Sequence, residues 1–343
     1  MLKKIAKVVI FLLVAALVLN GVCKVMKLKH VDGIYPLTIF YELPEDSCDV
    51  MFFGTSHTFE GINPAIIWRE QGIPSYVLAG STQPMWSTYF YMKEAFKYQK
   101  PKVVVLDIDT TFFKGDGTSE EGLYNDYSRM VKNTIGMRFS LDKVRATMVN
   151  APKELWGDIL LGFPTYHTRY TDLKENDFTG YWEDYPECWK GHCEHRGKQA
   201  FGTPDVTGVT EATPLEPKVE EWFLKILDLC EEEDVELLLT CYPFVISNME
   251  QSVYLTVEQI ANERNIPFIN FNTHQELLNL DYGFDFGDEN HLNYNGNPKL
   301  SAYMAQYLMD NYDLEDKRGT DEKYDSWDAN LQFYNDTHVM KRK

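Results

Sequence analysis

Two patterns of hydrophobic and polar positions alternate along the chain. Short continuous apolar runs, which are typical of parallel strands buried on both faces, are separated by longer stretches whose apolar residues recur at helical spacing. The apolar runs predict strands at 49–53, 74–80, 101–109, 235–243 and 266–271. The longer stretches predict helices at 63–72, 85–100, 216–234, 253–265 and within 293–312. Five strands alternating with helices indicate an α/β fold, a layered sandwich around a five-stranded parallel sheet.

The alternation is interrupted between residues 110 and 214, a region rich in aromatic residues, proline and glycine. We interpret this region as a large insertion after the third strand, with helices expected at about 141–149 and 152–161. Its aromatic side chains either stack on sugar rings in a polysaccharide cleft or form a core of their own, since the segment has few aliphatic residues. They include Trp156, Tyr166, Tyr170, Tyr181, Trp182 and Trp189.

The N-terminal segment has the composition of a membrane anchor. Val8 to Cys23 carries no charge and follows three lysines. Sixteen residues span roughly 24 Å as a helix, slightly short of the ~30 Å hydrocarbon core, and flanking lysines can reach the interface. We interpret 1–30 as an uncleaved anchor with its N-terminus in the cytoplasm and the body outside. The alternative is a cleaved signal peptide, which would export the body as well.

This interpretation divides the rest of the chain into three parts. A connector at 31–47 leads to the main domain at 48–312, which contains the insertion at 110–214. Residues 313–343 form a charged tail that either wraps the body or frays.

Charge is unevenly distributed. The net charge is −19, but residues 1–30 carry six lysines and no acids, so the remainder sums to −19 − 6 = −25. Nucleic-acid binding needs clustered Lys and Arg, so a body this acidic argues against nucleic acid as a partner.

The cysteines are interpreted here for a body that lies outside the cytoplasm, where disulfides form. Cys188 and Cys193 share one short stretch with His192 and His195, and a Cys188–Cys193 disulfide is the first interpretation outside the cytoplasm. Zinc bound by these two Cys and two His is the weaker alternative, because the spacing matches no standard finger. His192 is otherwise expected on the surface or in a loop, and no metal or cofactor is predicted.

Reactive residue types gather where the predicted strands end. Gly54-Thr55-Ser56-His57 follows the first strand, Gly80 the second, and Asp288 with His291 the fifth. In open α/β sheets, ligands bind beyond the carboxyl ends of the strands. A serine hydroxyl becomes a nucleophile when a base takes its proton, and a carboxylate on the other ring nitrogen orients that base. We therefore predict Ser56 as nucleophile, His291 as base and Asp288 as its partner, with the Ser56 and Gly80 amides as oxyanion donors.

Three neighbouring side chains have alternative interpretations. Asp285 and Glu289 are ranked below Asp288 as partners of the base. His57 is expected to be structural, with its side chain turned away from the nucleophile, since it is the next residue in the chain.

Gly54-x-Ser56, Gly80 and Asp288-x-x-His291 together resemble the SGNH (GDSL-type) hydrolase superfamily over residues 48–312. The resemblance implies a flavodoxin-like three-layer sandwich and a Ser-His-Asp esterase or acyltransferase. One position departs from the family, which has an oxyanion Asn after the third strand. Here Asp107, Asp109 and Thr110 stand nearby, and an ionised carboxylate cannot donate a hydrogen bond. Because they stand where the family has its Asn, Asp109 and Thr110 are our candidates for the third oxyanion position.

The layout of anchor, connector and serine motif is similar to that of D-alanyl-lipoteichoic-acid transfer and alginate O-acetylation proteins. That similarity implies a cell-surface glycan or glycopolymer as substrate and a membrane-bound O-acyltransferase as partner. We predict a serine-dependent O-acyl esterase or acyltransferase that works through a Ser56 acyl-enzyme. The alternative is a non-catalytic partner of the acyltransferase or polymer on the same scaffold, which the absent Asn favours.

Overall fold

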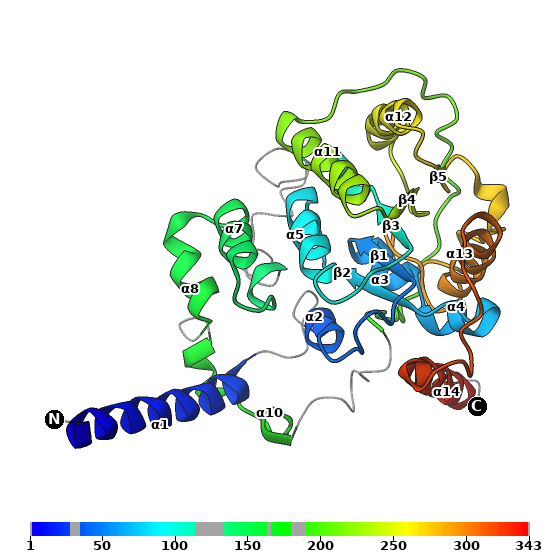
Figure 1. Ribbon diagram of the computed structural model, residues 1–343. Helices are drawn as coiled ribbons and strands as arrows, with labels where there is room; N and C mark the ends of the chain where they lie inside the picture. The colour runs from blue at the N-terminus through cyan, green and yellow to red at the C-terminus, as the bar shows by residue number, and fades with distance from the viewer. Residues whose placement is uncertain (1, 28–34, 114–132, 163–165, 180–189, 342–343) are drawn as a thin grey trace.

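A computed structural model describes residues 2–27, 35–113, 133–162, 166–179 and 190–341 (Figure 1). Its centre is one five-stranded sheet in which every paired neighbour is parallel, with strand order β2-β1-β3-β4-β5. The strands are β1 (Val50–Gly54), β2 (Ser75–Ala79), β3 (Val103–Asp107), β4 (Glu236–Cys241) and β5 (Phe268–Asn270). The predicted α/β class, a flavodoxin-like sandwich around a five-stranded parallel sheet, is confirmed.

Helices cover both faces of the sheet, as Figure 1 shows. Alternate residues of each strand point to opposite faces. Met51 and Phe53 of β1 pack with α5 (Met85–Ala95), α11 (Pro217–Glu232) and α12 (Asn248–Glu263). Val50 and Phe52 pack with α4 (Pro64–Gln71) and α13 (Asn297–Asn311). This two-sided burial explains why the strands read as continuous apolar runs.

Most predicted helices lie where expected, with shifted ends. Asn63 caps α4 by accepting from the Ala65 N–H, and Gly72 ends that helix in the left-handed conformation. The predicted helix at 253–265 begins earlier, since Ser247 and Glu250 form a reciprocal capping box at the start of α12.

The described insertion has helices before residue 180 and irregular backbone from 190 to 214, and the helical part has a small core. It forms α7 (Leu141–Asn150), α8 (Trp156–Leu161) and α10 (Glu175–Thr179). Trp156 and Tyr166 belong to this small core, while Tyr170 is exposed. Tyr181, Trp182, Cys188 and Trp189 lie outside the described residues, as does the predicted Cys188–Cys193 disulfide.

The N-terminal segment is α1 (Leu2–Met26), and within the described residues it is the single helix long and apolar enough to cross a membrane. None of its apolar window is buried inside the protein. A signal sequence has the same length and composition, so the helix is compatible with both interpretations of 1–30.

The acidic C-terminal tail contains a helix that the apolar pattern did not predict. α14 (Asp325–Lys341) packs against α4, and the Trp327 side chain is fully buried. The Trp327 Nε1–H donates to the Ser75 carbonyl at 2.9 Å, and Trp68 Nε1–H donates to Asp328 at 2.8 Å. Two indole rings thus attach the tail to the edge strand β2 and to α4.

Trp327→Ala is expected to lower the free energy of unfolding by about 3–5 kcal/mol, because it removes a fully buried ring and leaves a cavity. Chemical denaturation of the variant and of the parent chain measures this loss. Tyr170→Ala, at an exposed ring, is the matched control and should change stability by less than about 0.5 kcal/mol. A loss below about 1 kcal/mol at Trp327 would contradict a structural role for the tail.

Candidate active site

Ser56 is the first residue of a helix that follows directly on β1. The helix is α3 (Ser56–Gly61), and its cap is Thr55, whose hydroxyl oxygen accepts from the His57 N–H at 3.2 Å. A Cβ atom on Gly54 would lie 2.3 Å from Thr58 Oγ1 and 2.6 Å from Asp107 Cβ. Glycine is therefore required where the strand turns into the helix. The turn places the serine at the carboxyl edge of the sheet, where β1 and β3 lead to opposite sides.

His291 and Asp288 reach Ser56 from the loop between β5 and α13. His291 Nε2 lies 2.7 Å from Ser56 Oγ, and His291 Nδ1 lies 2.7 Å from Asp288 Oδ1 and 2.9 Å from Oδ2. The loop is held by the Gly287 N–H, which donates to the His291 carbonyl, and by the Asn290 N–H, which donates to Asp288. In the neutral tautomer that fits these contacts, Nδ1–H donates to Asp288 and Nε2 accepts from the serine hydroxyl.

The charges of this loop favour an ionised carboxylate and a basic imidazole. Partial burial raises the pKa of Asp288, but the hydrogen bond from His291 and the charge of that ring outweigh burial and hold the pKa well below its usual range. Burial lowers the pKa of His291, but the hydrogen bond to Asp288 and the carboxylates of Glu60 and Asp288 raise it above the ordinary 6.5. Both shifts favour transfer of a proton to His291.

Two further side chains of this site were not predicted from the sequence. Glu60 Oε2 lies 3.9 Å from His291 Nδ1, and His195 Nε2 lies 3.3 Å from Asp288 Oδ2. Glu60 stands four residues after Ser56 on α3, a spacing that signals one helix face once the helix is recognised. The insertion supplies His195, and no sequence spacing relates it to Asp288.

His195 is held as the tautomer that can donate to Asp288. The Gly197 N–H donates to His195 Nδ1 at 3.0 Å, so the ring proton of neutral His195 is on Nε2, which faces Asp288. The His195 and His291 rings are stacked at 5.8 Å between centroids. A Cβ atom on Gly287 would lie 1.9 Å from His195 Nδ1, so glycine makes room for the ring. Asp288 is thus shared by two imidazoles.

His195→Phe is expected to lower kcat for a small ester about tenfold with little change in KM. The ring volume is kept, but Asp288 loses the contact of its Oδ2 with His195 Nε2 at 3.3 Å, so the carboxylate that faces His291 is held less firmly. His195→Gln, whose amide can still donate, should recover most of the loss. Steady-state hydrolysis of para-nitrophenyl acetate measures both. Equal activity of His195→Phe and the parent would show that this contact does not orient Asp288.

The end of β3 holds a buried carboxylate pair. Asp107 accepts from the Thr55 and Thr58 hydroxyls at 3.4 and 3.3 Å, and Asp109 accepts from Thr55 at 3.1 Å. Burial raises the pKa of Asp109 to about 6, and burial together with the charge of Asp109 raises the pKa of Asp107 well above its usual range. The Thr110 hydroxyl donates to the Gln83 carbonyl at 3.0 Å. Asp109 and Thr110, expected at the third oxyanion position, are therefore both hydrogen-bonded within the protein.

His57 lies closer to the site than expected. Its ring packs on Phe244 at 4.9 Å and meets the His291 ring edge-on at 5.6 Å between centroids. Nδ1 lies 3.6 Å from Asp109 Oδ1. Burial, followed by the charge of His291, lowers the pKa of His57 to about 3, so this ring stays neutral and adds no positive charge beside the base.

The region after β2 is crowded around Gly80. The Gly80 N–H donates to the Gly54 carbonyl at 3.4 Å, a long contact that continues the ladder between β1 and β2. A Cβ atom on Gly80 would lie 2.6 Å from Asn133 Oδ1 and 3.1 Å from Gln83 Oε1. The insertion thus brings a buried carboxamide, Asn133, against the predicted oxyanion residue.

The alternative partners of the base have other positions. Asp285 is buried, where it accepts from Lys299 Nζ at 2.6 Å and from the Asp281 N–H at 2.7 Å. Glu289 is exposed to solvent. Among these acids, Asp288 is the one hydrogen-bonded to His291.

Two groups of three side chains place possible metal-ligating atoms within 4.8 Å of one another: Glu60, His195 and His291, and His57, Asp107 and Asp109. A metal in the first group would take the imidazole that contacts Ser56. The two histidines of the weaker zinc interpretation have other contacts. His192 is buried, with Nδ1 2.8 Å from the Phe59 carbonyl oxygen, and His195 contacts Asp288. His192 thus lies in a loop, as one of its two expected positions allowed, but its side chain is buried and not on the surface.

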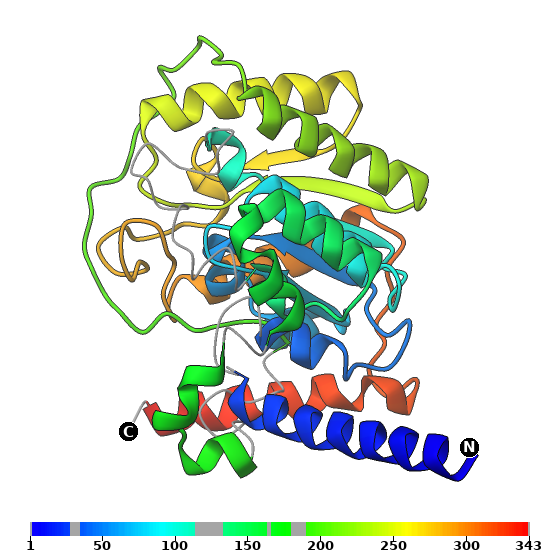
Figure 2. The same cartoon turned by 90° about the vertical axis from the view of Figure 1, so that its left-hand side faces the viewer.

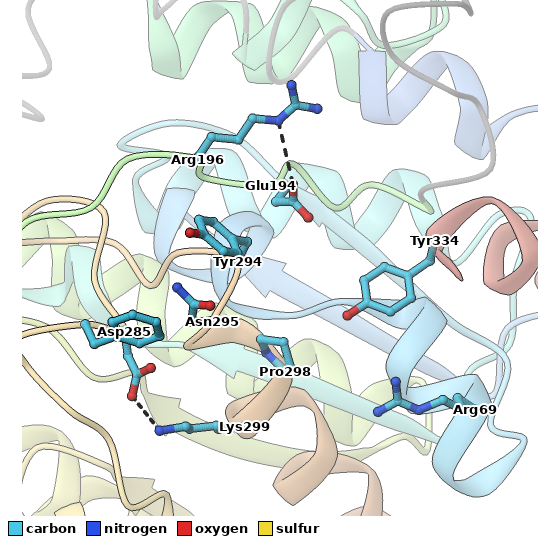
Figure 3. Close-up of a pocket in the computed structure, with 10 residues that line it drawn as sticks. Arg69, Glu194, Arg196, Asp285, Tyr294, Asn295, Pro298, Lys299 and Tyr334 are labelled. Carbon is cyan, nitrogen blue, oxygen red and sulfur yellow. Dashed lines mark hydrogen bonds and ion pairs between the residues drawn. The ribbon is translucent and has the colours of Figure 1, made fainter. Parts of the chain in front are cut away.

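A pocket of about 690 Å³ lies beyond His195 (Figure 3). Glu194 and Arg196, the sequence neighbours of His195, both line it, and the Tyr294 N–H donates to the His195 carbonyl. Tyr334 of α14 stands at the opposite end of the pocket from Tyr294 in Figure 3. The loop that contacts Asp288 on one side thus forms a wall of the pocket on the other.

No family model matches the sequence, and no curated protein matches it at a significant level. Among solved structures, the chain is similar to a Bacteroides fragilis protein described as a "putative acylhydrolase", with 10% identity and a TM-score of 0.40. The likeness covers 80% of this chain and 95% of that one. At this identity and TM-score it supports no statement about activity.

Proposed function

We propose that the protein is a serine-dependent O-acyl esterase or acyltransferase. The observation that carries the proposal is the unbroken line of short contacts from Asp288 through His291 to Ser56. Such a line is what nucleophilic acyl transfer requires, because it joins an orienting carboxylate, a base and a hydroxyl. The raised pKa of His291 and the lowered pKa of Asp288 support the same roles.

The reaction follows from these positions. Ser56 Oγ attacks the acyl carbonyl carbon while its proton moves to His291 Nε2, and the carbonyl oxygen becomes an oxyanion. Collapse breaks the bond to the alcohol oxygen, which takes the proton from His291 and leaves an acyl group on Ser56. Water, or a hydroxyl group of an acceptor, then attacks this ester with His291 again as base. Asp288 stays ionised throughout and stabilises the imidazolium.

The oxyanion needs donors that are already in place. The Ser56 amide is one candidate, because N–H groups in the first turn of a helix have no partner within the helix. The others are the Gly80 amide, whose contact with Gly54 is long, and the carboxamide of Asn133 beside it.

We propose that the substrate is an O-acyl group of a cell-envelope polysaccharide or glycopolymer, and that α1 holds the body outside the cytoplasm. The apolar, unburied α1 supports an anchored protein. The pocket beyond His195 offers the tyrosine rings of Tyr294 and Tyr334 together with charged side chains, which suits a polyhydroxylated ligand. A membrane-bound O-acyltransferase would supply the acyl group in the transfer reaction.

A second candidate is a non-catalytic protein that binds the polymer or the acyltransferase. The end of β3 favours it, because Asp107 and Asp109 stand there in place of an amide donor and Thr110 donates elsewhere. Three aligned reactive groups favour the enzyme, since a binding protein has no need of them.

Labelling with a fluorophosphonate probe, which reacts with activated serines, separates the two candidates. If the protein is the enzyme, the full chain in detergent should be labelled and the Ser56→Ala variant should not. Absence of label on the parent chain, or equal label on both proteins, would favour the binding protein.

A further inference from the structure

Large apolar side chains are exposed in one part of the body. Outside α1, every such side chain that is more than half exposed among the described residues belongs to the insertion. Phe139 is 77% exposed and Leu141 75%. The full set is Phe139, Leu141, Met148, Leu161, Tyr170 and Phe178. Single exposed apolar side chains are common on protein surfaces, but their concentration in one segment indicates a contact surface.

These side chains are not left over from a poorly packed core. In α7, Ala146, Thr147 and Asn150 are buried, while Leu141 and Met148 are exposed. Leu141 and Met148 stand seven residues apart, which is two helical turns, so they share a face opposite the buried one. In α8, Ile159 is fully buried and Leu161 is exposed. Each helix thus has an inner face that packs and an apolar residue on its outer side that is more than half exposed.

The same part of the insertion holds the end of α1. Met26, the last residue of α1, is buried in a small core with Ile159 and Tyr166. Arg169 Nη1 donates to the Met26 carbonyl at 2.6 Å, and its Nη2 pairs with Asp177 of α10 at 3.0 Å. Figures 1 and 2 show α10 beside the C-terminal end of α1, and both α10 and the short helix η3 (His167–Thr171) contact α1. If α1 spans a bilayer, this segment stands where the helix leaves the bilayer.

Charge separates this segment from the rest of the body. Residues 133–179 contain six basic and six acidic side chains, whereas everything after residue 30 sums to −25. Where a leaflet carries anionic lipid, its negative surface potential repels an acidic protein surface. The neutral segment is therefore the part of the body best able to approach a bilayer.

We propose that residues 133–162 and 166–179 form a membrane-contacting element whose exposed apolar side chains enter the interface of the bilayer that α1 crosses. The proposal rests on α1 as the anchor and is independent of the chemistry at Ser56. Apolar side chains on short helices gain free energy by inserting at the boundary between headgroups and acyl chains. A second contact beside α1 would fix the orientation of the body relative to the membrane.

The test places an environment-sensitive NBD label on the full chain at Leu161→Cys, in vesicles of phosphatidylcholine with a minority of phosphatidylglycerol. The matched control is Asp310→Cys, an exposed residue of α13, and Val14→Cys in α1 reports insertion of the anchor. The labelled parent chain supplies the background from native thiols. Lipids with a doxyl quencher on the acyl chain should quench the label at 161 by about half and leave the label at 310 unquenched, since interfacial helices insert only about 5–10 Å.

Equal, low quenching at 161 and 310 with strong quenching at 14 would overturn the proposal, because the anchor would be in place while the insertion stayed in water. A membrane protein would then be the expected partner of these apolar side chains, since the vesicles contain no other protein. Absence of quenching at 14 would overturn it as well, because α1 would not be the anchor. Neither result bears on fluorophosphonate labelling of Ser56, so failure of this proposal and of the proposed enzyme are distinguishable.

Discussion

Replacement of Ser56 by alanine is expected to lower kcat/KM for para-nitrophenyl acetate by at least about 10³-fold. The variant keeps the fold, because Ser56 is the first residue of α3 and the cap of that helix is Thr55. What it removes is the oxygen that lies 2.7 Å from His291 Nε2. Without that oxygen no acyl group can be carried by the protein, and any remaining hydrolysis comes from water. Steady-state kinetics on the purified full chain measures the loss.

Two controls make this result specific. The denaturation midpoint of Ser56→Ala should match that of the parent chain, and Ser252→Ala, at a serine of α12, should keep full activity. Activity of Ser56→Ala within about tenfold of the parent would mean that another group performs the hydrolysis.

Asp288→Asn is expected to lower kcat about 10²- to 10⁴-fold, because an amide can present its N–H to His291 and hold the ring in the wrong tautomer. Nδ1 would then accept a hydrogen bond rather than donate one, and Nε2 would already carry the ring hydrogen and could not take the proton of Ser56. The lower end of the range allows for solvent around Asp288, which is partly exposed.

The pH dependence of kcat/KM tests the contact between Asp288 and His291, and the direction of its shift can be predicted. His291 acts as a base only when neutral, so kcat/KM of the parent should fall as pH drops through the raised pKa of His291, above 6.5. Asp288→Asn removes the hydrogen bond and one of the charges that raise this pKa, so the acid limb should move to lower pH. If kcat/KM fell at the same acidic pH in both proteins, a direct contact between Asp288 and His291 in solution would be contradicted.

The sheet could be predicted from the sequence because every strand is buried on both faces. A run such as Val103–Asp107 has no polar face, so it reads as an uninterrupted apolar segment. Ser56 and the Asp288–His291 pair could be placed as well, because parallel topology brings the ends of β1 and β5 to one edge of the sheet. The alignment of Ser56, His291 and Asp288 follows from these positions.

The remaining parts of the site depend on contacts that no local pattern encodes. His195 and Asn133 come from the insertion, far along the chain from the strand ends they touch. His57 was expected to turn away, but burial against Phe244 places its ring beside His291. α14 was missed because tertiary contacts of Trp327, rather than an apolar stripe, hold this acidic helix in place.

The most direct measurement of the central claim is a search for the acyl-enzyme. The full chain is mixed with excess para-nitrophenyl acetate and quenched in acid during turnover, and its peptides are then examined by mass spectrometry. One added acetyl group is expected on the peptide that contains Ser56, and none on the same peptide of Ser56→Ala. Steady turnover with no acetyl group on Ser56, or with acetyl on another residue that alone supports turnover, would contradict the central claim.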